Sequence, residues 1–356
     1  MKRKILLFVI VVLSFITLVG CGNGTKNDEE IIKLESFHTQ DQALYLAGDY
    51  KLFATYAKGQ AELSRPNATI LSWDKVEGVT SYVVKITDTD SKQDIEFRTD
   101  TNSLNVYNLK INTKYYYEIT YESTTGSQSI EKKAFIIEDV CPRNLFIDGV
   151  TNVRDIGGYK TSSGKYVKQG LMYRSGRFSE NETGEPLVTI NGCKSFVNDL
   201  GLKTEIDLRR TDNNETGNIT SSPLGDGVKY TSIPMATGGN YLKINKENIP
   251  YVFKELANKD NYPLVFHCSI GTDRTGVIAF LVNGFLGVSE EDLYRDYLFS
   301  NFGLIEEMRT PSTIKGYLQE IKMQDGGSLE KQFTNYLLSL GISQTELNTI
   351  RSIMLG

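Results

Sequence analysis

The stretch VFHCSIGTDRTG, residues 265–276, places an arginine six positions after a cysteine. The apolar residues 264–266 predict a buried strand, and the apolar residues that follow Thr275 predict a helix. Where a strand turns through a short loop into a helix, several backbone N–H groups and the helix N-terminus face one spot. The stretch therefore predicts a binding site for an anion such as phosphate, in which Arg274 can bind two oxygens at once.

The thiol of Cys268 lies at the start of this loop, where the backbone N–H groups and the helix N-terminus also act on the sulfur. A thiol at a helix N-terminus ionises readily, so we expect a thiolate that attacks phosphorus and forms a cysteinyl-phosphate. We expect the Thr275 hydroxyl to hydrogen-bond the thiolate, Gly271 to let the backbone curl, and His267 to orient the loop. The residues expected to bind the phosphate are Ser269, Ile270, Gly271, Thr272, Thr275 and Gly276.

Composition and charge exclude several kinds of site and partner. The 356 residues are enough for two domains, and the net charge of −5 argues against a nucleic-acid partner. The chain has only two histidines and no CxxC or HExxH motif, so we expect no metal site. The chemistry expected at Cys268 requires no organic cofactor. We expect Cys193 to be a small core residue of a helix and Cys141 to be unpaired.

The N-terminus predicts the compartment of the protein. The basic residues MKRK precede an uncharged apolar run that ends at Cys21. The small residues before this cysteine resemble the lipobox of bacterial lipoproteins, in which the cysteine is lipidated. This resemblance implies a signal peptide over residues 1–20, a tether over 21–35, and a lipid anchor at the extracytoplasmic face of the cell membrane. The alternative is an uncleaved N-terminal anchor.

Short strands with turn-like separators predict an all-β sandwich in the N-terminal half. The stretches LSWDKVEGVTSYVVKI and LNVYNLKINTKYYYEI resemble the Trp-bearing and Tyr-bearing strands of fibronectin type III modules. We therefore expect a fibronectin-like sandwich over residues 36–139, with Trp73 in its core. For residues 31–66 the sequence allows two alternatives, the first strand of the sandwich or a helical segment that precedes it.

From residue 140 onward, strand-length apolar runs followed by helical patterns predict an α/β domain, residues 140–356, with a central sheet flanked by helices. The C-terminal helix is predicted by the capping-box pair Ser343 and Glu346. The Cys-x5-Arg motif resembles that of the protein tyrosine phosphatase superfamily. NVRDIGGY, LMYRSGRF, IDLRR and RDYLFSN are similar to segments of bacterial tyrosine/serine or lipid-type phosphatases. That family usually has lysine where this chain has Thr272, which removes one positive charge from the loop.

A phosphatase of this kind needs a proton donor for the leaving group, and two carboxylates compete for that role. Asp273 lies inside the loop, and the resembling families are thought to use an aspartate there. Asp207, in IDLRR, is the second candidate, and its alternative is a strand-end carboxylate that pairs with Arg209. We expect Arg154 and Asp155 to support the loop without taking part in chemistry.

Together these features predict a lipid-anchored, cell-surface phosphatase that acts on phosphate monoesters. The substrate is a phosphorylated protein, lipid or small molecule. The alternative is an adhesion or binding lipoprotein whose second domain holds phosphorylated ligands without turnover.

Overall fold

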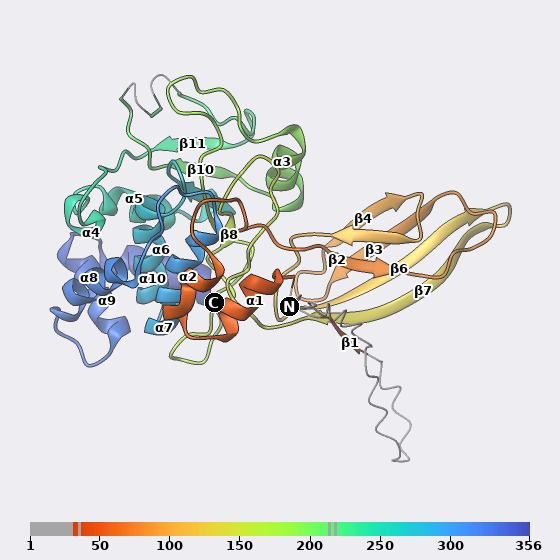
Figure 1. Ribbon diagram of the computed structural model, residues 1–356, viewed down its shortest axis with the longest axis horizontal. Helices are drawn as coiled ribbons and strands as arrows, with labels where there is room; N and C mark the ends of the chain where they lie inside the picture. Colours follow the sequence, from red (N-terminus) through yellow and green to blue (C-terminus); the bar gives the residue numbers. More distant parts are fainter. Residues whose placement is uncertain (1–30, 35–36, 213–214, 217–218) are drawn as a thin grey trace, which may run out of the picture. The chain divides into compact units, whose positions relative to one another are not determined.

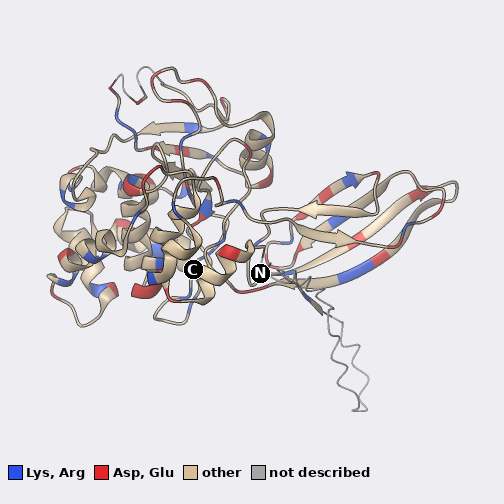
Figure 2. Cartoon of the chain, in the orientation of Figure 1, with Lys and Arg blue, Asp and Glu red and all other residues tan. Residues whose placement is uncertain are grey.

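Two five-stranded β-sheets organise the part of the chain that the computed structural model describes, residues 31–34, 37–212, 215–216 and 219–356 (Figure 1). The predicted signal peptide and Cys21 lie outside these residues. Within the described part, no helix is both long and apolar enough to cross a membrane. Basic and acidic residues are interspersed along both the strands and the helices (Figure 2).

The first sheet runs in the order β1-β7-β6-β3-β4, in which β1 is parallel to β7 and the other neighbours are antiparallel. A separate antiparallel pair joins β2 to β5. The strands are β1 (Ile31–Leu34), β2 (Thr69–Ser72), β3 (Tyr82–Asp88), β4 (Asp94–Thr99), β5 (Ser103–Val106), β6 (Lys114–Ser123) and β7 (Gly126–Ile137).

Alternate side chains of these strands form one hydrophobic cluster. In β3 the buried positions are Tyr82, Val84 and Ile86, which is the period-two pattern of a strand with one covered face. Trp73 packs edge-on against Tyr82, with ring centroids 5.3 Å apart. The cluster joins residues of the five-stranded sheet to residues of the β2–β5 pair, and Trp73 is buried in it.

The segment between β1 and β2 is helical and belongs with the C-terminal core. It contains α1 (Gln40–Ala47), the 3-10 turn η1 (Tyr50–Leu52) and α2 (Phe53–Tyr56). Tyr45 of α1 is fully buried in the large C-terminal cluster, and its hydroxyl donates to the Arg295 carbonyl at 3.0 Å. The expected domain boundary at residue 36 therefore places these helices in the N-terminal module, although they pack on the C-terminal core. Both alternatives for residues 31–66 occur, because strand β1 is followed by helices.

The second sheet runs in the order β11-β10-β12-β9-β8, and only β8 is antiparallel to its neighbour. Its strands are β8 (Arg154–Asp155), β9 (Met172–Ser175), β10 (Thr204–Asp207), β11 (Lys229–Ser232) and β12 (Leu264–His267). The register places Asp207 beside His267 and His267 beside Ser175, so three strands end together. The carboxyl ends of parallel strands are where ligands bind in open α/β sheets.

Helices and helical turns follow these strands along the chain. They are α3 (Ile190–Lys194), the π-helical turn η2 (Ser195–Asp199), α4 (Tyr241–Ile244), α5 (Ile249–Leu256), η3 (Lys259–Asn261), α6 (Asp273–Phe285), α7 (Glu290–Phe299), η4 (Ser300–Phe302), α8 (Pro311–Lys322), α9 (Leu329–Ser339) and α10 (Gln344–Leu355). The Ser343–Glu346 capping box begins α10, as its sequence predicts.

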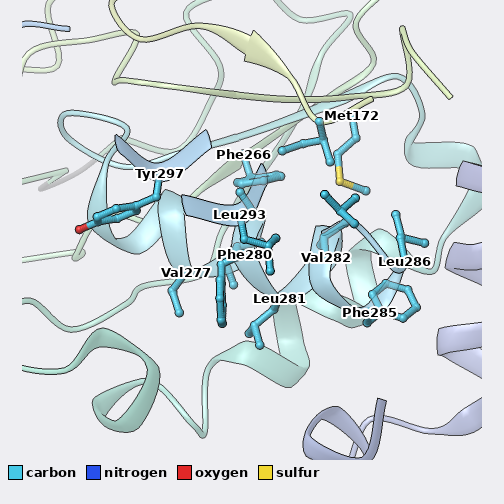
Figure 3. Packing of buried hydrophobic residues seen from close by; sticks show 14 of the residues in the cluster. Met172, Phe266, Val277, Phe280, Leu281, Val282, Phe285, Leu286, Leu293 and Tyr297 are labelled. Atoms are coloured by element: carbon cyan, nitrogen blue, oxygen red, sulfur yellow. The ribbon is translucent and has the colours of Figure 1, made fainter. Parts of the chain in front are cut away.

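Both faces of the second sheet are covered, as a parallel sheet requires. Phe266 and Met172 point into the cluster formed with α6 and α7, where Figure 3 shows them near Val282 and Leu293. Val265, one residue along β12, points instead into the cluster that contains η2. All residues of α6 are buried, which explains why its run 276–282 is apolar on every side rather than on one face.

Candidate active site

The loop between β12 and α6 lies at the carboxyl edge of the second sheet, and Gly271 determines how closely it packs there. This glycine has φ +71°, and a Cβ atom placed on it would lie 2.5 Å from the carbonyl carbon of Ser175 at the end of β9. A side chain at this position would therefore be strained and would also collide with the backbone of β9. The close approach brings the loop into contact with the end of the neighbouring strand.

The carbonyl groups of the loop bind donors of the surrounding protein, whereas its N–H groups bind no protein acceptor within the described part of the chain. The carbonyls of Ser269, Ile270 and Gly271 accept hydrogen bonds from the Arg177 amide (3.1 Å), Asn152 Nδ2 (3.2 Å) and Arg174 Nη2 (2.9 Å), respectively. In contrast, none of the backbone N–H groups of residues 269–274 donates to an acceptor among the described residues. Buried N–H groups rarely lack a partner, so these donors are available to an anion.

The thiol of Cys268 is 2% exposed and lies at the base of the loop. Burial raises the pKa of this thiol, but the charge of Arg274 and hydrogen bonds from Thr275 outweigh it, so the pKa lies below its ordinary value. The buried Thr275 hydroxyl has no hydrogen-bond partner among the described residues, so its proton is not committed to another group. The site thus favours a thiolate.

Arg274 is buried and paired with Glu215, a residue that the sequence did not single out. Its Nη2 and Nη1 donate to Glu215 Oε1 (2.6 Å) and Oε2 (2.7 Å). Ser269 Oγ donates to the same carboxylate at 2.9 Å. Burial would raise the pKa of Glu215, but its bonds to Arg274 lower that pKa to about 2. The pair therefore stays ionised, and the guanidinium is held beside the loop.

Asp273, the first residue of α6, is bound by a second arginine. Arg309 donates from Nε to Oδ1 (2.9 Å) and from Nη2 to Oδ2 (2.8 Å), while Tyr297 donates to Oδ1 at 3.0 Å. These three bonds occupy both carboxylate oxygens of Asp273. A proton donor at this position would have to exchange these partners.

Asp207 shows the alternative predicted for it, a pairing with Arg209. Its carboxylate accepts from Nε and Nη2 of that residue and from the Tyr230 hydroxyl. Burial raises the pKa of Asp207, but the charges of His267 and Arg209 outweigh it and hold the pKa below its usual value. Because Asp207 is fully buried and ionised, its geometry suits a structural ion pair better than a proton donor.

His267 is buried beneath the loop and contacts it through the backbone, as expected. Its Nδ1 lies 3.3 Å from the Cys268 carbonyl oxygen, and its Nε2 lies 2.9 Å from Glu205 Oε1. Burial lowers the pKa of His267, but Asp207 and Glu205 raise it by more, so the imidazolium is favoured. Glu205, Asp207 and His267 bring possible metal-ligand atoms within 4.8 Å of one another. The partners described above already account for most of those atoms, so the arrangement is that of an ion-pair network.

The remaining predicted residues occupy supporting positions. Arg154 binds Asp296 and Asn152, and Asn152 in turn donates to the Ile270 carbonyl of the loop. Asp155 instead pairs with Arg143 and accepts from the amides of Gly157 and Gly170, so it shapes the segment after β8 rather than the loop.

Two further loop residues and two cysteines complete the predicted set. Thr272 is fully buried and its hydroxyl donates to the Ile270 carbonyl at 3.4 Å. Gly276 allows α6 to approach the Tyr297 ring, which would lie 3.0 Å from a Cβ atom. Cys141 and Cys193 are unpaired, and Cys193, predicted to be a core residue, lies in α3 and is only partly buried against the core.

Glu215, Arg309 and Glu205 escaped the sequence-based prediction. The sequence contained one indirect signal, because a buried Arg274 and a buried His267 each require an anionic partner. It did not show which acidic residues would supply those partners, since they lie 59 and 62 positions away.

Comparison with known proteins agrees with this geometry. The family described as "Tyrosine phosphatase family" matches residues 145–356. A Cupriavidus necator protein provisionally named a tyrosine-protein phosphatase is 25% identical over 183 residues, covering 44% of this chain and 63% of that protein. A tyrosine-protein phosphatase of Nostoc commune is 29% identical over 121 residues, covering 28% and 41%. The chain thus spans less than two thirds of either relative.

Among solved structures, the core catalytic domain of the PP-IP phosphatase SIW14 from S. cerevisiae is similar, with 17% identity. The match covers 47% of this chain and 89% of that one, and its TM-score of 0.31 is too low to support an inference. The family match extends over more than half of the chain and includes the entire loop from Cys268 to Arg274. The chain therefore belongs to the tyrosine phosphatase family.

Proposed function

We propose that the protein hydrolyses phosphate monoesters through a cysteinyl-phosphate intermediate. The observation that carries this proposal is the Cys268 thiol, whose pKa is lowered, beneath the unpaired N–H groups of residues 269–274. The thiolate attacks phosphorus and the ester oxygen departs with a proton. Water then attacks the phosphocysteine, which releases orthophosphate and restores the thiolate. The N–H groups and Arg274 stabilise the charge on the phosphoryl oxygens in both steps.

Asp273 is the proposed proton donor, because it lies in the loop and Asp207 is held as a buried ion pair. To act, Asp273 must exchange the bonds from Arg309 for the leaving oxygen of the substrate. The same residue would then accept a proton from the attacking water in the second step. No step requires a metal ion or an organic cofactor.

The substrate is a phosphorylated protein, lipid or small molecule held outside the cytoplasm. In this proposal Cys21 is lipidated, residues 1–20 are removed, and the enzyme is anchored at the outer face of the cell membrane. Residues 36–139, which contain strands β2 to β7, form the fibronectin type III-like module. Support for it comes from the cluster shared by both sheets and from the contact between Trp73 and Tyr82.

The test is hydrolysis of p-nitrophenyl phosphate by protein that begins at residue 22, with and without EDTA. We expect turnover in both conditions and none in Cys268→Ser, which should still bind p-nitrophenyl phosphate. Full turnover in Cys268→Ser would overturn the mechanism, and loss of turnover with EDTA would show that a metal is needed.

A binding protein without turnover is the second candidate. Two observations favour it: Glu215 binds both terminal nitrogens of Arg274, and Arg309 binds both oxygens of Asp273. In that function the wild-type protein would bind p-nitrophenyl phosphate as tightly as Cys268→Ser does and would release no nitrophenol.

A further inference from the structure

Beneath the loop lies a cluster of buried charges that does not balance. Arg154 and Arg174 are both fully buried, and they share a single carboxylate, Asp296. Arg154 donates to Oδ1 at 2.8 Å, and Arg174 donates to Oδ2 at 2.5 Å. Burial raises the pKa of Asp296, but the two arginines outweigh it and hold the carboxylate ionised. The cluster therefore carries two positive charges and one negative charge.

Each of the other buried cations around the loop has a carboxylate partner that it does not share with a second buried arginine. The pairs are Arg274 with Glu215, Arg309 with Asp273, Arg209 with Asp207, and His267 with Glu205. Each cation in this set has its own carboxylate within hydrogen-bonding distance. Within the described part of the chain, the Arg154–Arg174–Asp296 cluster is thus the group next to the loop with an excess positive charge.

Arg174 is the member of the cluster that touches the loop. Its Nη2 donates to the Gly271 carbonyl at 2.9 Å, and the same nitrogen would lie 3.6 Å from a Cβ atom placed on Gly276. Its Nε has no hydrogen-bond partner among the described residues. Burial and the neighbouring Arg154 lower the pKa of Arg174 to about 10, while Asp296, Tyr159 and Cys268 raise it. The guanidinium is thus charged at neutral pH and lacks a full counter-charge.

An uncompensated buried charge is strongly unfavourable, so it requires an anion nearby. We propose that Arg174 and Arg154, with Asp296, form a built-in counter-charge for the ionised sulfur of Cys268 and for the phosphoryl group that this sulfur later carries. Arg174 acts as a positioning residue because it touches the loop carbonyl rather than the substrate. The inference rests on the proposed function, since it explains how the nucleophile of that mechanism is kept ionised.

The charged and titratable groups on and around the loop come from several elements. They are His267 of β12, Glu205 and Asp207 of β10, Arg174 of β9, Asp273, Arg274 and Thr275 of α6, Asp296 and Tyr297 of α7, Tyr159, and Glu215 through Arg274. Because the proposal concerns only the excess charge, the test changes that charge in both directions and leaves the remaining groups in place.

The experiment is alkylation of Cys268 by iodoacetamide across pH, followed by mass spectrometry of the peptide that contains it. Arg174→Met removes the excess charge and should raise the midpoint of the titration by about one pH unit. Asp296→Asn leaves two unpaired cations and should lower it by about one unit. Arg174→Lys keeps the charge and should stay close to wild type. A purely structural role would not move the two midpoints in opposite directions.

The matched control is Arg143→Gln, a buried arginine that forms a balanced pair with Asp155, and it should leave the midpoint unchanged. Circular dichroism would verify folding of every variant. If Arg174→Met does not fold, Asp296→Asn decides, and a midpoint at or above that of wild type overturns the inference. An ordinary thiol midpoint in the wild-type protein would instead contradict the proposed nucleophile, so the two failures are distinguishable.

Discussion

Glu215 holds Arg274 by one edge of its guanidinium. The two terminal nitrogens point at the two carboxylate oxygens, Nη1 also reaches the Leu208 carbonyl at 3.4 Å, and Nη2 reaches Ser269 Oγ at 3.4 Å. The Nε of Arg274 makes no hydrogen bond within the described residues. A planar guanidinium has a second edge, formed by Nε and Nη2, so this pairing leaves one edge for a phosphate.

The first prediction concerns that orientation. Glu215→Gln should weaken inhibition by orthovanadate about tenfold, because Arg274 then samples several rotamers and must be ordered again on binding, at a cost of about 1–2 kcal/mol. The measurement is the inhibition constant, with KM for p-nitrophenyl phosphate as a second readout. Tighter inhibition in the variant would mean that the carboxylate occupies the place of the phosphate.

The second prediction separates the two candidate acids. Asp273→Asn should lower kcat about 100-fold or more for alkyl phosphates, which have poor leaving groups, and much less for p-nitrophenyl phosphate. Asp207→Asn should instead destabilise the fold by about 3–5 kcal/mol, because it leaves Arg209 buried without its charge partner. Kinetics with both substrates and urea unfolding of both variants provide the check. An Asp207→Asn enzyme that folds normally but loses only alkyl phosphate turnover would reverse the assignment.

The third prediction follows from the raised pKa of His267. A raised pKa means that the charged pair with Glu205 stabilises the fold fully below the ordinary value of 6.5, and that this contribution is lost as pH rises through the higher folded value. Glu205→Gln should therefore destabilise the protein more at pH 6 than at pH 9. Urea unfolding at the two pH values measures the difference, and equal destabilisation at both would show that the pair is not ionic.

The fourth prediction tests the close approach of the loop to β9. Gly271→Ala should abolish most turnover and destabilise the fold by about 1–3 kcal/mol, because the added Cβ would collide with the Ser175 backbone in addition to the strain of positive φ. Gly78→Ala is the matched control, since Gly78 has φ +77° and a Cβ atom added there would meet no atom within 4 Å. The control should retain full kcat and show only the smaller effect of backbone strain. Comparable activity losses in both variants would contradict the role of the contact.

Local sequence patterns predicted those helices and strands whose formation depends on residues close together in the chain. The run 264–276 predicted a strand, a loop and a helix, and these occur as β12, the loop and α6. Ser343 and Glu346 predicted the start of α10. Such features follow from backbone donors and side-chain periods a few residues apart, so a single stretch of chain contains the information.

The sequence by itself therefore predicted the candidate nucleophile, the arginine and the family resemblance, because all three lie within one short loop. Tertiary structure alone decided which carboxylate binds Arg274, which arginine binds Asp273, and that residues 40–56 pack on the C-terminal core. It also decided that two arginines share Asp296. These pairings join residues far apart in the chain, and in each case burial of a charge imposes the need for a partner while only the packing of the elements selects it.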